Sequence, residues 1–305
     1  MKLGVIGLNP GNGHPFSFSA IVNGYSDDGF AKSGWPVIHD YLRAKDLADF
    51  GFPGVRVTHA WTQDAATTRV LCEASLVDHA VEEPRQMIGA VDAVLICRHD
   101  HETHHRMAMP FLEAGVPVYV DKPLSLDVPE LIAFRPYLES GKLMSCSAML
   151  YARELDDLRA TLAEYGALKV VRAAVVLDWE KYGVHMVDAV LNLGYAKPVA
   201  VTRLPARHDS FAIEMDDGSL FQVDALGEST KNFRLDVFGT KRDSTHQLFD
   251  NFHAFRRCLG HFIRMVETGK PQLDPNFTLT SMKVMIAGNM SHAQNRRISL
   301  DDVGL

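Results

Sequence analysis

Short apolar runs that alternate with helical segments in the first half of the chain constrain its fold more than any other feature. Near-continuous apolar runs at Lys2–Gly7, Val91–Arg98 and Val116–Asp121 are typical of strands that are buried on both faces. Val55–Trp61 alternates like a further strand, and Lys142–Met149 is predicted to close the sheet. The segments between them are predicted to be helical at Phe16–Val22, Val37–Phe50 and Ala65–Ala80, with a surface loop at Ser26–Trp35. This succession predicts parallel β-α-β units and a doubly wound parallel sheet, an α/β fold.

The pattern changes after Arg153. One helix, Glu154–Tyr165, precedes long alternating segments that predict strands at Leu168–Trp179, Val199–Ala206, Ser210–Met215, Ser219–Leu226 and Phe233–Phe238. Asp216-Asp217-Gly218 predicts a hairpin turn between two of them. Two helices, Asn251–Thr268 and Thr278–Asn295, complete the chain. We therefore predict two domains, residues 1–149 and 150–305, the second an α+β domain with an open, mainly antiparallel sheet.

Composition narrows the possible partners and the compartment. The 305 residues suffice for two domains, and a net charge of −7, spread along the chain, argues against nucleic acid and anionic membrane as partners. The four cysteines are far apart and form no C-x-x-C pair, which favours reduced thiols. The opening MKLGVIGLNPG does not resemble a signal peptide, and no apolar stretch approaches the ~20 residues of a membrane span. We expect a cytoplasmic protein.

A loop rich in glycine and asparagine, Gly7–His14, follows the first predicted strand. A helix that opens from a strand offers free N–H groups and a positive dipole end to a pyrophosphate, and glycines allow its close approach. The loop departs from G-x-G-x-x-G, because Asn9 and Asn12 stand at the second and third glycine positions. A plain structural turn is the alternative. We predict a Rossmann-type site for NAD or NADP whose loop residues are Gly7, Asn9, Gly11, Gly13 and His14.

The acidic residue that would hold the adenosine ribose is expected after the second strand. Asp64 is the only carboxylate near that strand end. Its alternative role is to cap the helix predicted at Ala65–Ala80. The choice between NAD and NADP therefore stays open.

The run Asp121-Lys122-Pro123 ends a predicted buried strand. Ligands of parallel sheets bind outside the carboxyl ends of the strands, so we expect Lys122 to point into that crevice. The alternative is a solvated lysine at the edge of the sheet.

Several motifs agree in order and spacing with one family. They are Ala93-Val94-Leu95-Ile96 followed by His104, Phe111–Gly115, Asp121-Lys122-Pro123, Gly183–Asp188 and Phe262–Pro271. With them the chain resembles the Gfo/Idh/MocA oxidoreductases, a family that includes glucose-fructose oxidoreductase and inositol dehydrogenase. The family usually has Glu-Lys-Pro where this chain has Asp-Lys-Pro.

The resemblance implies an NAD(P)-dependent dehydrogenase or reductase that acts on the CH–OH group of a polyol, sugar or sugar acid. It implies that residues 1–149 bind the dinucleotide, with Asp121 and Lys122 at the cofactor, and that residues 150–305 bind substrate and form a homodimer or homotetramer. Lys122 would orient the substrate, and His185 would take its hydroxyl proton, work that suits an imidazole at neutral pH. Asp188, three residues on and on the same helix face, and Arg153 would hold substrate groups.

One position departs from the family. An aspartate commonly stands four residues before the histidine, and here that residue is Lys181. Asp178 and Glu180 lie close by, and Asp178 is the substitute that we predict in the substrate site. The departure keeps a second hypothesis open, a non-catalytic dinucleotide-binding sensor protein.

The stretch Arg98–His105 contains a literal H-E-x-x-H, His101–His105. This spacing can place two imidazoles on one helix face for zinc. No third ligand stands at a recognisable spacing, and the stretch follows a predicted Rossmann strand, so we predict no metal. Instead Arg98 and His99 are expected at the cofactor pocket, where Arg98 would favour an anionic substrate group.

Overall fold

The computed structural model describes residues 1–229 and 232–305, which form two compact units. The first unit comprises residues 1–121, 134–145 and 255–273, and the second comprises residues 122–133, 146–254 and 274–305. The chain thus passes from the first unit to the second at the Asp121–Lys122 peptide bond and again between Ser145 and Cys146. The functional boundary between residues 149 and 150 stays a prediction.

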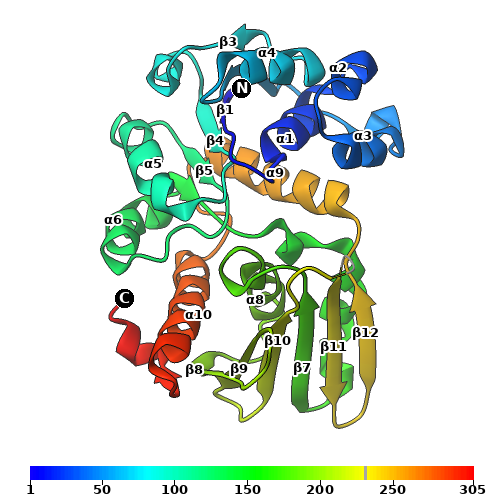
Figure 1. Cartoon of the computed structure of the whole chain (residues 1–305), viewed down its shortest axis with the longest axis vertical. Coiled ribbons are helices and arrows are strands. Elements are labelled where there is room, and N and C mark those ends of the chain that lie inside the picture. Colours follow the sequence, from blue (N-terminus) through cyan, green and yellow to red (C-terminus); the bar gives the residue numbers. More distant parts are fainter. Residues whose placement is uncertain (230–231) are drawn as a thin grey trace. The chain divides into compact units, whose positions relative to one another are not determined.

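The first unit is built on a six-stranded parallel sheet (Figure 1). The strands follow the order β3-β2-β1-β4-β5-β6, and every neighbouring pair is parallel. Their bounds are β1 Lys2–Ile6, β2 Arg56–Trp61, β3 His79–Ala80, β4 Ala93–Ile96, β5 Val118–Val120 and β6 Leu143–Met144. This is the strand order of a doubly wound dinucleotide-binding fold, and it confirms the predicted fold of this half.

Helices α1 His14–Asn23, α3 Pro36–Arg43, α4 Ala65–Ala74 and α5 His104–Glu113 lie between these strands in the chain. Helix α6, Val128–Glu139, has residues in both units, as has α9, Asn251–Thr268. The predicted loop Ser26–Trp35 was wrong in part, because it contains a short helix, α2 Asp27–Ala31. The Ser26 side chain starts α2 by accepting a hydrogen bond from the N–H of Gly29.

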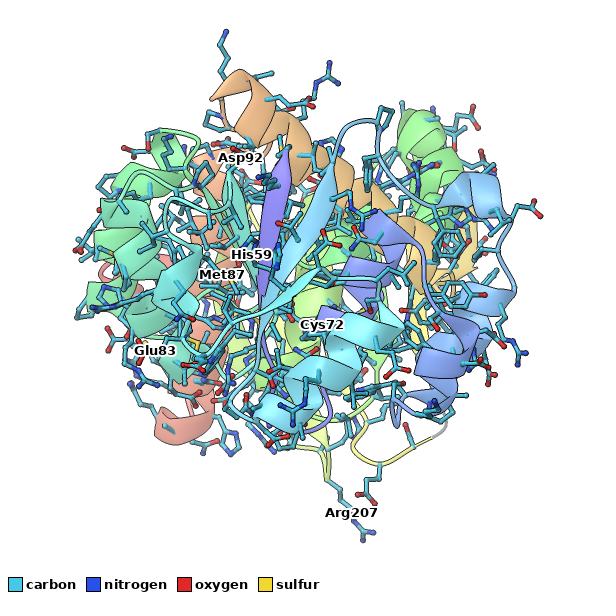
Figure 2. The ribbon with its side chains drawn as sticks, turned by 90° about the horizontal axis from the view of Figure 1, so that it is seen from above. His59, Cys72, Glu83, Met87, Asp92 and Arg207 are labelled. Atoms are coloured by element: carbon cyan, nitrogen blue, oxygen red, sulfur yellow. The ribbon has the colours of Figure 1, made fainter. Side chains whose placement is uncertain are left out.

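Close packing around β1 needs a residue without a side chain at Gly4. A Cβ atom there would lie 2.6 Å from Sδ of Met87, a distance that real Cβ contacts do not show. The start of β1 is held by Asp92, whose carboxylate accepts a hydrogen bond from the N–H of Lys2 at 2.6 Å. Figure 2 labels Met87 and Asp92, and also His59 of β2, whose ring lies 4.7 Å from that of His79.

The second unit contains a seven-stranded mixed sheet in the order β12-β11-β7-β10-β9-β8-β13. Its strands are β7 Leu168–Val175, β8 Pro198–Arg203, β9 Asp209–Met215, β10 Leu220–Ala225, β11 Phe233–Gly239, β12 Asp243–Gln247 and β13 Ile298–Ser299. Only the central pair of β7 and β10 is parallel among these described strands. The hairpin at Asp216-Asp217-Gly218 joins β9 to β10, and Gly218 has a φ of 80°. Strand β12 was not predicted.

Helices α8 Val184–Leu191 and α10 Pro275–Gln294 pack together and against this sheet, and α7 Asp156–Thr161 precedes it in the chain. In β7 the side chains of Val171, Ala173 and Val175 are buried, whereas Arg172 on the alternate face is exposed. The sheet therefore has one core face and one partly solvated face. None of the described helices combines the length and the apolar character that a membrane crossing requires.

A π-helical turn, Trp179–Gly183, joins this sheet to α8. The prediction that the β7 strand extends to Trp179 was wrong, because the strand ends at Val175. Trp179 is fully buried, stacks at 4.2 Å on Phe211 and donates its indole N–H to the main-chain oxygen of Met285. A side chain on Gly183 would collide with this indole. The turn is thus determined by tertiary packing, and such turns are often found at functional sites.

Candidate functional site

The glycine loop between β1 and α1 leaves space where a phosphate needs it. Gly11 has a φ of 80°, and no atom lies within 4 Å of the position that its Cβ would occupy. Helix α1 begins directly after the loop and carries no acidic residue in its first turn. Open space beside a glycine and a helix N-terminus without negative charge suit a dinucleotide pyrophosphate.

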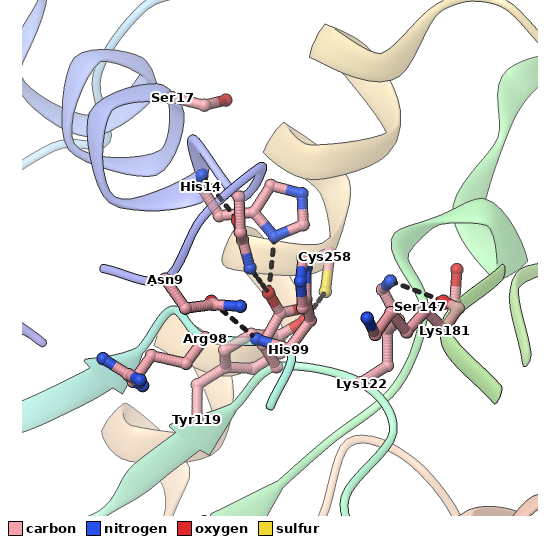
Figure 3. Close-up of polar contacts among 12 residues, drawn as sticks. Asn9, His14, Ser17, Arg98, His99, Tyr119, Lys122, Ser147, Lys181 and Cys258 are labelled. Carbon is pink, nitrogen blue, oxygen red and sulfur yellow. Dashed lines mark hydrogen bonds and ion pairs between the residues drawn. The ribbon is translucent and has the colours of Figure 1, made fainter. Parts of the chain in front are cut away.

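The loop is fastened to the end of β5 by a buried carboxylate. Asp121 is 2% exposed, and its Oδ2 accepts a hydrogen bond from Nδ2 of Asn12 at 2.9 Å. The same oxygen lies 2.6 Å from Nδ1 of His14, which is labelled in Figure 3. Asn12, His14 and Asp121 form what we call the loop cluster.

The start of the loop is held by residues that follow β2 and β4. The N–H of Leu8 donates to the side chain of Gln63 at 2.9 Å, and Arg98 donates to the main-chain oxygen of Leu8 at 2.6 Å. The side chain of Asn9 accepts the N–H of His99 at 3.2 Å. The predicted residues Asn9, Arg98 and His99 thus lie together at the carboxyl end of the sheet.

Arg98 is also paired with Asp100, at N···O distances of 2.8 and 2.5 Å. Burial raises the pKa of the Asp100 carboxyl, but the hydrogen bond and charge of Arg98 outweigh it, so that this pKa lies below its usual value. The guanidinium is 11% exposed and already satisfied by a carboxylate. The charge that we expected to attract an anionic substrate group is therefore neutralised within the first unit.

Asp64 acts as the N-cap of α4. Its carboxylate accepts hydrogen bonds from Oγ1 and from the N–H of Thr67, at 2.7 and 2.8 Å, and these bonds lower its pKa. Asp64 therefore has the alternative capping role, and its role at the ribose stays a prediction.

The H-E-x-x-H residues are engaged in local contacts. His101 lies 3.7 Å from Glu102, His104 bonds to the main-chain oxygen of Arg98 at 2.8 Å, and His105 packs edge-on against Phe134. Within residues 1–229 and 232–305, no three His, Cys, Asp or Glu side chains are grouped to hold a metal ion.

In the second unit, Lys122 lies against the π-turn. Its Nζ donates to the main-chain oxygen of Lys181 at 2.8 Å (Figure 3). It also lies 5.2 Å from the ring centroid of Tyr182, and that ring lies 5.4 Å from His185. Lys122 is only 4% exposed, so its ammonium is held in place by a carbonyl and an aromatic ring instead of water.

Ser147 connects the two residues of α8 that share a face. Its Oγ lies 2.7 Å from Nδ1 of His185, and its N–H donates to Oδ2 of Asp188 at 2.6 Å. The second oxygen of Asp188 accepts the hydroxyl of Ser281 at 2.5 Å. Lys122, Ser147, His185 and Asp188 form what we call the Lys-His cluster.

Asp188 is 1% exposed, and burial raises its pKa to about 6, although the bonds from Ser281 and Ser147 and the charge of Lys122 act in the opposite direction. Because both of its oxygens accept hydrogen bonds from the protein, Asp188 holds Ser147 and α8 in position.

The other predicted substrate residues have partners of their own. Asp178 caps the π-turn by accepting the N–H of Lys181 at 2.9 Å, and Glu180 accepts a hydrogen bond from Asn289. Arg153 lies 2.6 Å from the buried carboxylate of Asp250. Substrate contacts by Asp178 and Arg153 stay predictions.

Sequence reasoning missed Ser147, Tyr182 and Ser281. Ser147 and Ser281 contact α8 from distant positions in the chain, so no spacing reveals them. Tyr182 directly follows Lys181, the residue that differs from the family pattern. This neighbouring difference is the sequence signal that points to Tyr182.

Comparison with known proteins extends this picture. Residues 29–144 match the family model GFO_IDH_MocA, described as an oxidoreductase family with an NAD-binding Rossmann fold. Comparison with curated protein sequences gives no match.

Solved structures share the whole fold. A scyllo-inositol dehydrogenase from Lactobacillus casei superimposes with a TM-score of 0.79 at 12% identity, covering 99% of this chain and 98% of that one. A myo-inositol 2-dehydrogenase from Lactobacillus plantarum gives 0.78 at 15% identity, covering 98% and 99%. A myo-inositol dehydrogenase from Lactobacillus casei in complex with NAD(H) and myo-inositol gives 0.76 at 13% identity, covering 98% and 96%.

The family description confirms the prediction of a nicotinamide dinucleotide cofactor. Residues 29–144 therefore match an oxidoreductase family with an NAD-binding Rossmann fold, and the similar structures share the fold over nearly the whole chain.

Proposed function

We propose that the chain is an NAD(P)-dependent dehydrogenase or reductase that acts on the CH–OH group of a polyol, sugar or sugar acid. The observation that carries this proposal is the Lys-His cluster, in which a buried ammonium and an imidazole are held 5.2 and 5.4 Å from the same Tyr182 ring. The inositol dehydrogenases among the similar structures support the substrate class. The NAD(H) in one of them supports the cofactor.

The loop residues Gly7, Asn9, Gly11, Gly13 and His14 are proposed to hold the dinucleotide, whose nicotinamide accepts or supplies a hydride when it is bound. The open space at Gly11 and the acid-free start of α1 support this assignment. Arg98, His99 and Asp121 support the loop from the ends of β4 and β5.

In the oxidation direction, the imidazole of His185 accepts the proton of the substrate hydroxyl, and in reduction it returns that proton. Ser147 fixes the orientation of the imidazole through Nδ1. The ammonium of Lys122 stabilises negative charge that develops on the substrate oxygen, because a buried cation acts at low effective dielectric. Asp188 keeps Ser147 in place.

A screen of polyols, sugars and sugar acids with NAD⁺ and NADP⁺, read as reduced nicotinamide, tests the proposal. With the best substrate, His185→Ala is expected to lower kcat by about 10²–10⁴ while dinucleotide binding persists, because a general base typically contributes this much. Dinucleotide binding without turnover of any substrate would favour the sensor protein. Normal hydride transfer in His185→Ala would remove His185 from the mechanism.

We also propose a homodimer or homotetramer that associates through the outward face of the second-unit sheet. On that face Phe238, Val170 and Leu220 are in register across β11, β7 and β10 and form an apolar row. Phe238 is 41% exposed. Light scattering is expected to give a multiple of the 33.9 kDa chain mass, and Phe238→Glu is expected to reduce it.

A cytoplasmic location is proposed on the four cysteines, which are thiols and not disulfides in the described residues. Mapping of thiol oxidation in cells tests this location.

A further inference from the structure

The start of α1 offers fewer main-chain donors than a helix start normally provides. The first N–H groups of a helix have no partner within the helix, and dinucleotide phosphates bind to them. Here the N–H of His14 donates to the side chain of Asn12 at 2.9 Å, and Pro15 has no N–H. Two donors at the phosphate-binding end are therefore unavailable.

The side chain of His14 lies at the same start of α1 at which these two main-chain donors are unavailable. Nδ1 is fixed by Asp121 at 2.6 Å, and the ring stacks on Phe18 at 4.9 Å and meets Phe255 edge-on at 5.0 Å. Among the described residues, none makes a hydrogen bond with Nε2 of His14, and the side chain is 21% exposed. A carboxylate on one ring nitrogen orients the imidazole, and in the cationic form of the ring Nε2 is a donor.

The charged group that contacts this imidazole is the carboxylate of Asp121 at the end of β5. Cys97 follows β4 and interacts with Asp121, and burial, then the Asp121 charge, raises the pKa of its thiol, so that Cys97 is neutral. From α1 and α9 the ring is met by Phe18 and Phe255, which carry no charge.

We propose that His14, held by Asp121, is a phosphate-binding residue whose imidazolium donates from Nε2 to a pyrophosphate oxygen of the dinucleotide. It replaces the main-chain donors that Asn12 and Pro15 remove. This inference rests on the proposed cofactor site and adds the identity of the donor.

Removal of the imidazole consequently lowers dinucleotide affinity, because the main-chain donors at this helix start cannot take its place. Loss of one charge-assisted hydrogen bond corresponds to about a tenfold increase in Kd.

Calorimetric titration of the full chain with NAD⁺ at one fixed pH tests the inference, with no substrate present. His14→Gln, which can still bond to Asp121 but lacks the Nε2 donor, is expected to bind with a Kd about tenfold higher than that of the wild type. His292→Gln, an exposed histidine in the last turn of α10, serves as the matched control and is expected to follow the wild type.

Asp121→Asn gives a second route to the same result. Without the carboxylate, the ring loses the contact that orients it, and the Kd is expected to rise as in His14→Gln. An equal Kd in the wild type and in His14→Gln overturns this inference and leaves the proposed function standing. Absence of NAD⁺ binding by the wild type overturns the proposed cofactor site itself.

Discussion

Nζ of Lys122 lies 2.8 Å from the main-chain oxygen of Lys181, while Asp178 accepts the N–H of Lys181 and Glu180 accepts a hydrogen bond from Asn289. The family commonly has an aspartate at the position of Lys181. In this chain the π-turn presents the backbone of that residue to the ammonium instead. A main-chain carbonyl positions a cation without adding a second full charge, so this lysine is fixed by the fold of the turn and not by the identity of residue 181.

The first prediction follows from this contact. Lys181→Ala keeps the carbonyl, so we expect its kcat to stay within about twofold of the wild type, whereas Lys122→Ala loses about 10²-fold or more. Asp178→Asn retains an oxygen that can cap the turn, and Glu180→Gln changes only an exposed contact to Asn289, so both are expected to remain active. Steady-state kinetics of the four variants show whether Lys122 is positioned by the main chain or by the side chain of residue 181. A large loss of kcat in Lys181→Ala would contradict positioning by the main-chain carbonyl.

The second prediction concerns Ser147, which joins His185 to Asp188. Ser147→Ala removes the hydroxyl at Nδ1 of His185 but keeps the N–H that bonds to Asp188. We expect kcat to fall about tenfold, as for the loss of one orienting hydrogen bond, with the affinity for NAD⁺ unchanged. Ser147→Thr, which restores a hydroxyl, is the matched control and should recover most of the activity. An unchanged pH profile of kcat in Ser147→Ala would show that the hydroxyl does not act through the imidazole.

The third prediction uses the pKa of Asp188, which burial raises to about 6, about two units above the ordinary value of an aspartate. Below pH 4 the Asp188 carboxyl is protonated in both the folded and the unfolded chain. Between pH 4 and 6 the unfolded chain releases this proton first, so the free energy of unfolding decreases as pH rises. The decrease is about 3 kcal/mol, from two pH units at about 1.4 kcal/mol each.

Urea unfolding of the wild type and of Asp188→Asn from pH 4 to pH 7 measures this decrease. All other groups titrate alike in the two proteins, so the difference between their unfolding free energies isolates Asp188. This difference in unfolding free energy should change by about 3 kcal/mol between pH 4 and pH 7. Parallel curves would mean that Asp188 is ionised at low pH in the folded protein.

The parallel half of the fold could be predicted from the sequence because each central strand is an apolar run that ends at a glycine or a polar residue. The elements that were missed lack such a signal. Helix α2 has five residues, too few to show a period, and β12, Asp243–Gln247, is a polar edge strand without apolar alternation. The π-turn depends on the packing of Trp179 between residues that are far away in the sequence.

The residues of the candidate site also differ in whether the sequence alone reveals them. Lys122 and His185 belong to motifs, and motifs can be recognised without knowing the contacts. Ser147 is 38 residues from His185, and its role follows only from their hydrogen bond. Arg98 shows the opposite case: its charge invites the prediction of an anionic substrate, but only the structure shows that Asp100 neutralises it.

The last prediction tests whether the π-turn is held by Trp179. The indole fills the space left by two glycines: a Cβ at Gly183 or at Gly288 would approach within 2.6 Å of it. Trp179→Ala creates a cavity and should cost about 3–5 kcal/mol of unfolding free energy. Gly288→Ala forces the indole to move and should cost about 1–3 kcal/mol by overpacking.

Both variants are also expected to lower kcat, because displacement of the turn moves the Lys181 carbonyl away from Lys122. Gly260→Ala is the matched control, since this glycine also lies within a helix, α9, and its Cβ would meet only Phe52 at an ordinary 3.5 Å. That variant should be as active as the wild type and more stable by up to about 1 kcal/mol, the helix preference of alanine over glycine. If Gly288→Ala lost stability but kept full activity, the packing of Trp179 would support the fold without positioning Lys122.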